Sequence, residues 1–160
     1  MSKKYFIDAN RVQQILINLL SNAIKFSRNG DEINIQINES STMEPHTTKI
    51  TIQVMDSGIG MSPDDVSGLF QPFYRTKDSK SRERNPNGHG LGLSISSQIA
   101  EGLGGSLKCE SELGVGTSFI FSFTAKKIID HAPIKPKVIE GGKKPKAKPK
   151  KKTVAKLPSI

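Results

Sequence analysis

Residues 8–27, DANRVQQILINLLSNAIKFS, are the stretch that decides the fold of this chain. Apolar side chains recur there at three- and four-residue intervals, which predicts a helix with one buried face. These side chains are Val12, Ile15, Leu16, Leu19, Leu20, Ala23 and Ile24. At about 100° per residue, Asn18, Asn22 and Lys25 gather within an arc of about 60° beside that face.

The two asparagines are the unusual residues of this helix. Asparagine is a poor helix former, because its amide competes for backbone hydrogen-bond partners. A solvated helix face usually carries Glu, Lys, Gln or Ala, so Asn18 and Asn22 favour a bound ligand over a merely polar surface. The helix alone leaves both interpretations open. Asp8 or Asn10 can cap its start, and Asn29-Gly30 is expected to end it.

Composition restricts the class of protein. At 160 residues the chain suits a single domain with a real core. No apolar run approaches the roughly 20 residues that cross a membrane, and the start SKKYFID does not resemble a signal peptide. The single cysteine, Cys109, excludes an internal disulfide and a cysteine zinc cluster. We expect a soluble cytoplasmic domain, which leaves room for a membrane anchor elsewhere in a longer parent protein.

The net charge of +9 is confined to one end of the chain. Residues 126–160 hold 12 Lys against two acidic residues, whereas residues 1–125 carry 12 basic and 13 acidic groups. The basic segment is rich in Pro and Lys and has no aromatic residue, which predicts a disordered tail or linker. Its charge permits weak binding to anionic surfaces, but it lacks the stacking side chains of single-strand binders. We expect no specific nucleic acid partner.

Four segments have the pattern of β-strands. Isoleucine and valine alternate over residues 33–37 and 50–54, which predicts two half-buried strands. Two more strands are expected over about residues 106–112 and 117–124, joined by a turn at 113–116.

Two further helices and a polar loop lie between these strands. Ser62-Pro63 begins a short helix that runs toward Leu69-Phe70. Residues 75–90 have the polar, glycine-bounded composition of a mobile loop. A third helix covers Leu93 to Leu103 and stops at Gly104-Gly105. This order predicts an α+β fold, a two-layer α/β sandwich with a mixed, largely antiparallel sheet and helices on one face.

Three glycine-containing segments have the chemistry of a binding site. Asp56-Ser57-Gly58-Ile59-Gly60 follows a strand, where a carboxylate can accept a hydrogen bond from an amino group, although Asp-x-Gly is equally ordinary in turns. Gly88–Leu93 precedes a helix, so its N–H groups can face a phosphate; a flexible hinge is as good an interpretation. It is neither a Rossmann nor a Walker motif. Gly114–Thr117 alone favours a hairpin turn.

The aromatic residues and histidines give weaker signals. Phe70 and Phe73 most simply cap a core, and a hinge for the following loop is the alternative. His46, His89 and His131 lack partners at ligand spacing, so they are interpreted as loop, lid and tail residues and not as catalysts or metal ligands.

Taken together and in this order, five segments resemble the ATP-binding catalytic domain of histidine kinases. This domain belongs to the GHKL superfamily, with type II topoisomerases, a heat-shock chaperone and mismatch-repair ATPases. NLLSNAIKFS resembles the N box, DSGIGM the first glycine box, LFQPFYRT the F box, GHGLGLSI the second glycine box and GVGTSFIF the third. The resemblance covers about residues 8–124 and implies a catalytic domain over 1–125. It further implies a Bergerat-type sandwich with an ATP lid at about residues 75–90, and a first strand represented at most by Tyr5-Phe6-Ile7.

The resemblance also implies a role for each matched residue. Asn22 would give its amide oxygen to Mg²⁺, with Asn18 nearby, and Lys25 would meet phosphate oxygens, so these three are the candidate catalytic residues. Asp56 would accept a hydrogen bond from the adenine amino group. The other residues expected to contact ATP are Phe26 at its border, Gly58 and Gly60 against the ring, the lid cations Arg75 and Lys77, the second-glycine-box residues Gly88, Gly90, Leu91 and Gly92 at the triphosphate, and Thr117 through water.

Asn18 narrows the expected chemistry. In hydrolytic branches of the superfamily, its position resembles a glutamate that activates water, whereas an amide cannot act as a general base. Phosphoryl transfer mainly needs positioning and charge neutralisation, so transfer is expected in place of fast hydrolysis.

The expected function is therefore transfer of the ATP γ-phosphate to a histidine in another domain, in two-component phosphorelay signalling. None of the three histidines here has the context of an acceptor. The expected partners are a His-bearing dimerisation domain and a response regulator. The alternatives are a non-catalytic ATP-binding switch module, an anti-sigma-type serine kinase of the same fold, and a basic adaptor that acts through its tail.

Overall fold

The computed structural model describes residues 4–76 and 79–128. Lys77 lies outside these residues, and so does the predicted tail over 126–160 except for its first three positions. Within the described part of the chain, no helix has the length and apolar character needed to cross a membrane.

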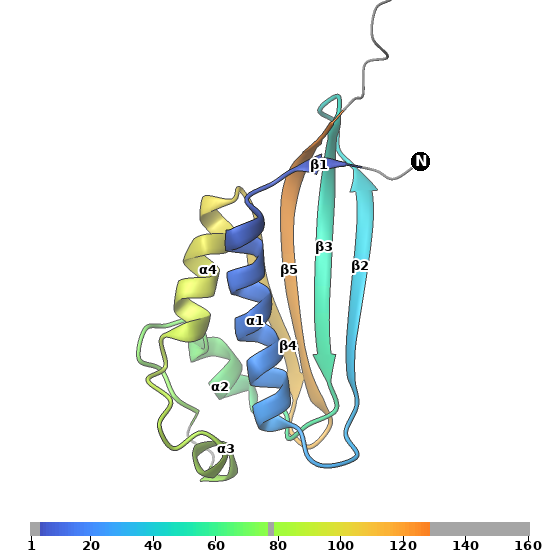
Figure 1. Cartoon of the computed structure of the whole chain (residues 1–160). Coiled ribbons are helices and arrows are strands. Elements are labelled where there is room, and N and C mark those ends of the chain that lie inside the picture. Colours follow the sequence, from blue (N-terminus) through green and yellow to red (C-terminus); the bar gives the residue numbers. More distant parts are fainter. Residues whose placement is uncertain (1–3, 77–78, 129–160) are drawn as a thin grey trace, which may run out of the picture. The chain divides into compact units, whose positions relative to one another are not determined.

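A five-stranded sheet forms one layer of the domain (Figure 1). Its strands are β1 (Tyr5–Phe6), β2 (Ile33–Ser41), β3 (Thr47–Asp56), β4 (Ser106–Glu112) and β5 (Gly116–Lys127). Strand β5 pairs with β1, β3 and β4, and β2 lies at the edge beside β3. Each of these pairings is antiparallel, so the sheet predicted as mixed has no parallel pair among the described strands.

Among the described residues, four helices form the second layer, all on the same face of the sheet (Figure 1). They are α1 (Ala9–Phe26), α2 (Pro63–Gly68), α3 (Ser79–Arg84) and α4 (Gly92–Gly102). Alternate residues of β3 and β5 point toward this layer and are buried there. The predicted α+β sandwich is confirmed. Its core consists of Val12, Ile15, Leu19, Ala23, Ile50, Ile52, Val54, Ala100, Leu107, Phe119, Phe121, Phe123 and Ala125.

The start of helix α1 could be predicted from its own sequence, but its end could not. The Asp8 carboxylate caps it by accepting the N–H of Arg11 at 3.1 Å. Burial of an Ile or Leu side chain contributes about 1.5–3 kcal/mol, and α1 buries Ile15 and Leu19 completely. The helix ends at Phe26 and not at Asn29-Gly30. Asp31 accepts the N–H of Arg28 at 2.6 Å, so a local turn replaces the next helical bond.

Three further predictions about local structure need correction. The segment over 75–90 is not a structureless loop, because it contains α3. Phe73 does not cap the core: it is largely exposed, with a φ of 62°, whereas Phe70 does pack on the core.

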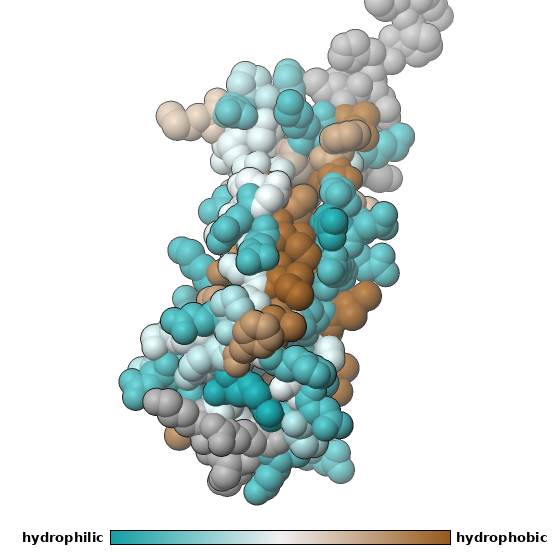
Figure 2. Space-filling view, turned by 90° about the vertical axis from the view of Figure 1, so that its left-hand side faces the viewer, coloured by the Kyte–Doolittle hydropathy of each residue, from teal (hydrophilic) through white to brown (hydrophobic). Residues whose placement is uncertain are grey.

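The third correction concerns β2, which is exposed along its whole length and not half-buried. Strand β2 is an edge strand, and α1 packs on its neighbour β3. The isoleucines of β2 therefore stay uncovered, and Figure 2 shows a continuous apolar stripe along this face of the domain.

Candidate functional site

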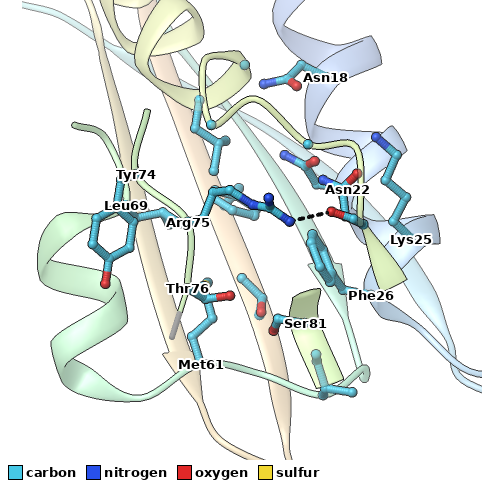
Figure 3. Close-up of a pocket in the computed structure, with 18 of the residues that line it drawn as sticks. Asn18, Asn22, Lys25, Phe26, Met61, Leu69, Tyr74, Arg75, Thr76 and Ser81 are labelled. Carbon is cyan, nitrogen blue, oxygen red and sulfur yellow. Dashed lines mark hydrogen bonds between the residues drawn. The ribbon is translucent and has the colours of Figure 1, made fainter. Parts of the chain in front are cut away.

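A cavity of about 440 Å³ lies between the sheet and the helices. It is bounded by α1, by the end of β3, and by the segment that connects α2 to α4 (Figure 3). Twelve of the predicted site residues line it: Asn18, Asn22, Lys25, Phe26, Asp56, Gly60, Arg75, Gly88, Gly90, Leu91, Gly92 and Thr117. Of the two others, Gly58 is not part of the lining and Lys77 lies outside the described residues.

The polar edge of α1 forms one wall of this cavity, and Figure 3 shows Asn18, Asn22 and Lys25 projecting from it. The Asn18 amide nitrogen donates to the hydroxyl of Ser96, which is 2% exposed, at 2.9 Å. A Cβ atom on Gly92 would lie 2.5 Å from the Asn18 amide oxygen, so α4 fixes this amide from two sides. In contrast, the Asn22 amide makes no hydrogen bond to any residue that the structure describes. Its oxygen is available to a ligand.

The Asp56 carboxylate forms the opposite end of the cavity. It lies at the end of β3, directly across from Thr117 of β5, and is 9% exposed. Burial raises the pKa of Asp56, and the N–H groups of Gly58 and Thr117 partly oppose that rise. The Gly58 N–H donates to one carboxylate oxygen at 3.0 Å. Gly58 therefore positions Asp56 from the side away from the cavity. It does not line the cavity, although the prediction placed it against the ring.

Sequence reasoning missed Ser111, which supports this end of the cavity from β4. Its hydroxyl donates to the carbonyl of Gly116 at 2.8 Å and accepts the N–H of Met61 at 2.9 Å. It also lies 3.0 Å from the hydroxyl of Thr117. The predicted turn over 113–116 would have paired Glu112 with Thr117, whereas the turn in the structure is one residue shorter and places Ser111 opposite Thr117.

The N-terminus of α4 faces the same cavity. The first N–H groups of any α-helix lack intrahelical partners, and Leu91, which precedes α4, offers them no side-chain acceptor. The Leu91 carbonyl accepts from the hydroxyl of Ser94 at 2.9 Å and from the N–H of Ile95 at 3.0 Å. The helix therefore presents backbone donors to the cavity, without a competing carboxylate from its own cap.

The described part of the segment over 75–90, which lacks residues 77 and 78, borders the cavity. One bond holds it together internally: Arg75 donates to the carbonyl of Asn85 at 2.9 Å (Figure 3). Another bond joins it to the helix layer, because Arg84 of α3 donates to the carbonyl of Ser27, just beyond the end of α1. Lining residues that sequence reasoning did not assign to the site are Ile59, Met61, Leu69, Tyr74, Thr76, Ser81, Asn85, Asn87, His89, Leu93 and Phe119.

The sheet is antiparallel and has its helices on one face. A cavity with a lid lies between a buried carboxylate and a helix edge that carries amide side chains. These features define an ATP-binding domain of the Bergerat type. Comparison with known proteins identifies the family. Residues 7–127 match the family described as histidine kinase-, DNA gyrase B- and HSP90-like ATPase, and the chain belongs to this family. The resemblance to the ATP-binding domain of histidine kinases is confirmed.

Several similar proteins are sensor kinases. The chain is 42% identical over 120 residues to the sensor protein GacS of Pseudomonas syringae pv. syringae, which covers 75% of this chain and 13% of that protein. It is 40% identical over 113 residues to the autoinducer 2 sensor kinase/phosphatase LuxQ of Vibrio cholerae, and the match covers 70% of this chain and 12% of that protein. The chain thus spans about an eighth of the length of these relatives.

Solved structures share the fold. The catalytic domain of histidine kinase ThkA is 32% identical, with a TM-score of 0.57, and the match covers 72% of this chain and 67% of that one. Full-length ShkA, solved in complex with AMPPNP, is 28% identical, with a TM-score of 0.59 over 78% of this chain and 24% of that one.

Proposed function

We propose that the chain binds Mg·ATP in this cavity and presents the γ-phosphate to a histidine on a separate dimerisation domain, in two-component phosphorelay signalling. The observation that carries the proposal is the cavity itself. It joins a buried carboxylate at one end to the polar edge of α1 at the other, and the described residues of the segment over 75–90 border it. A cytoplasmic location and a downstream response regulator belong to the same proposal.

The Asp56 end of the cavity suits adenine. One carboxylate oxygen accepts the Gly58 N–H, and the carboxylate can also accept the exocyclic amino group of the base. Gly60 lines the cavity without a side chain, so the flat ring can approach the backbone there. Ser111 fixes the Thr117 hydroxyl beside Asp56, where a bridging water would complete recognition of the base.

The α1 end of the cavity suits the triphosphate and its metal. The structure describes no cluster of three or more His, Cys, Asp or Glu side chains, so Mg²⁺ would depend on amide and phosphate oxygens and on water. The unengaged amide of Asn22 fits that donor set. When bound, Mg²⁺ neutralises phosphate charge. Lys25, Arg75 and the N-terminus of α4 would hold the phosphate oxygens.

Asn18 supports transfer over hydrolysis. Its amide nitrogen already donates to Ser96, and an amide is no general base for an attacking water. In the proposed transfer, an imidazole nitrogen of the acceptor attacks the γ-phosphorus, the bond to the β,γ-bridging oxygen breaks, and ADP leaves.

The test mixes the chain with radiolabelled ATP and candidate His-bearing dimerisation domains. Label on the partner that is lost in acid and kept in base would support histidine phosphorylation. Acid-stable label would indicate a serine kinase, and ATP binding with no label on any partner would favour the switch module. Rapid ATP hydrolysis by the isolated chain, surviving further purification, would contradict the assignment of Asn18.

We expect Asn22→Ala to remove the magnesium-dependent part of ATP binding. Loss of a hydrogen bond or ligand contact to a charged group costs about 1.5–3 kcal/mol, so affinity in the presence of Mg²⁺ should fall at least about 10-fold. Titration with a fluorescent ATP analogue, with and without Mg²⁺, measures this change. Asn10→Ala, on the exposed face of α1, is the matched control and should bind like the wild type. An unchanged magnesium effect in Asn22→Ala would rule Asn22 out as the ligand.

A further inference from the structure

Five exposed isoleucines, none of which lines the cavity, lie on α1 and β2. Figure 2 shows an apolar stripe along this side of the domain. Helix α1 contributes Ile17, 59% exposed, and Ile24, 67% exposed. Strand β2 contributes Ile35, 52% exposed, and Ile37, 66% exposed, together with the less exposed Ile33. We call these five residues the isoleucine strip. Single exposed apolar residues are normal on protein surfaces, whereas a continuous set of large ones marks an interaction site.

The strip is one surface because of the sheet register. Ile35 lies opposite Val54 and Ile37 opposite Ile52, and both partners are buried beneath the helices. Residues directly opposite each other in an antiparallel pair share a face, so the β2 isoleucines also point to the helix side. Helix α1 packs on β3 and leaves this part of the sheet uncovered. The outer face of α1 and the inner face of β2 therefore border the same open strip.

The strip itself is uncharged, and the first charge on this face of β2 is Glu39, which lies opposite the buried Ile50. Residues 33–38 of β2 read INIQIN, with neither a charge nor a proline, although edge strands usually carry Lys, Pro or a bulge against unwanted pairing. Positions 10, 13, 17, 21 and 24 on the outer side of α1 are Asn, Gln, Ile, Ser and Ile. Solvated helix faces usually carry Glu and Lys. Depletion of charge is typical of the core of a protein interface.

We propose that a second copy of this chain covers the strip, with the two β2 strands paired antiparallel about a two-fold axis. Within the described residues β2 pairs with β3 alone, so the backbone groups of its other edge are open to a partner. An antiparallel register centred on Gln36 places Ile35 of each copy opposite Ile37 of the other. Ile35 and Ile37 then meet on the helix side, Ile33 of each copy faces Glu39 of the other at the two ends, and Asn and Gln meet on the opposite side.

The chemistry of the strip selects a second copy over other occupants. A two-fold interface requires a patch that is complementary to itself. The uncharged segment over residues 33–38 of β2, which alternates Ile with Asn or Gln, satisfies this without placing like charges together. A partner recognised by charge would gain nothing from this surface. An edge strand and five isoleucines correspond to a small interface, near the lower limit of about 1,000 Å² in total. We therefore expect a weak, concentration-dependent dimer.

The dimer is independent of the proposed kinase function. Asn18, on the cavity side of α1, bonds to Ser96 of α4, whereas Ile17 and Ile24 lie on the side toward β2. Pairing through β2 would leave the cavity open, so nucleotide binding and dimerisation can fail separately.

Sedimentation velocity of the full chain, from about 1 µM to about 500 µM, tests the proposal. We expect the mass to rise from one copy of 17.5 kDa toward two. Ile37→Lys should weaken association at least about 10-fold, because it buries a charge at the centre of the strip. Ile95→Lys is the matched control. It makes the same substitution at an exposed isoleucine of α4, outside the strip, and should dimerise like the wild type.

Two results would overturn the proposed dimer. A wild-type chain that stays monomeric throughout the concentration range overturns the proposal. A dimer that survives both Ile37→Lys and Ile17→Lys overturns it as well, since the interface then lies elsewhere. Thermal unfolding and ATP-analogue binding of each variant show that the fold and the cavity are intact.

Discussion

Asp56→Asn should lower the affinity for ATP by about 100-fold, within the range expected when a hydrogen bond to a buried charged group is lost. The proposed adenine contact needs an acceptor at this position, and the Asn side chain offers one oxygen where the carboxylate offers two. The N–H of Gly58 still donates a hydrogen bond to that oxygen, so the oxygen is less available to adenine. Titration with a fluorescent ATP analogue measures the loss. Asp64→Asn, at an exposed position in the first turn of α2, should leave affinity unchanged.

The same variant should not be less stable than the wild type. Burial raises the pKa of Asp56, so ionising it costs more in the folded chain than in the unfolded one. This cost is absent below the unfolded pKa and fully present above the folded pKa, so Asp56 destabilises the fold at neutral pH. Asp56→Asn should unfold at an equal or higher temperature at pH 7. A lower unfolding temperature would mean that the loss of binding reports damage to the fold.

Gly60→Ala should damage both the fold and the cavity. Gly60 has a φ of 63°, which costs an L-residue about 1–2 kcal/mol. A Cβ atom there would lie 1.9 Å from the carbonyl oxygen of Glu112, so the turn after β3 must also move away from the end of β4. We expect a total loss of about 3 kcal/mol or more and a fall in unfolding temperature of about 10 °C or more. Calorimetry measures both, and ATP-analogue affinity should fall because Gly60 lines the cavity.

Gly114→Ala is the matched control for this variant. Gly114 also has a positive φ, 83°, but nothing lies within 4 Å of the position that its Cβ would take. The Gly114→Ala variant should therefore lose only the stability that a positive φ costs an L-residue, about 1–2 kcal/mol, and keep its affinity for ATP. Equal losses in the two variants would assign the effect to backbone conformation alone and not to the contact with Glu112.

The parts of this structure that sequence could predict are those encoded locally. Helix α1, the cap at Asp8 and the alternation of β3 follow from spacings of two to four residues, and so does the shared direction of Asn18 and Asn22. The same logic failed for β2. Its alternation matches a half-buried strand, but burial depends on which strand takes the edge of the sheet. No local pattern carries that information.

Contacts between distant segments account for the rest. Asn18 and Ser96 are separated by 78 positions, and only the packing of α1 against α4 brings them together. The predicted place of Gly58 against the ring came from its motif, whereas the turn after β3 directs it toward the back of Asp56 and the carbonyl of Phe26. Helix α3 was missed because a six-residue polar helix has no apolar period.

The contact of Arg84 with the carbonyl of Ser27 has a consequence for kinetics. It ties the segment over the cavity to the end of the helix that bears Asn22 and Lys25. On the proposed function, loss of this contact would free α3 to move away from the end of α1 when ADP departs. Product release would then include a conformational step distinct from phosphoryl transfer, and the slower of the two steps would set the rate.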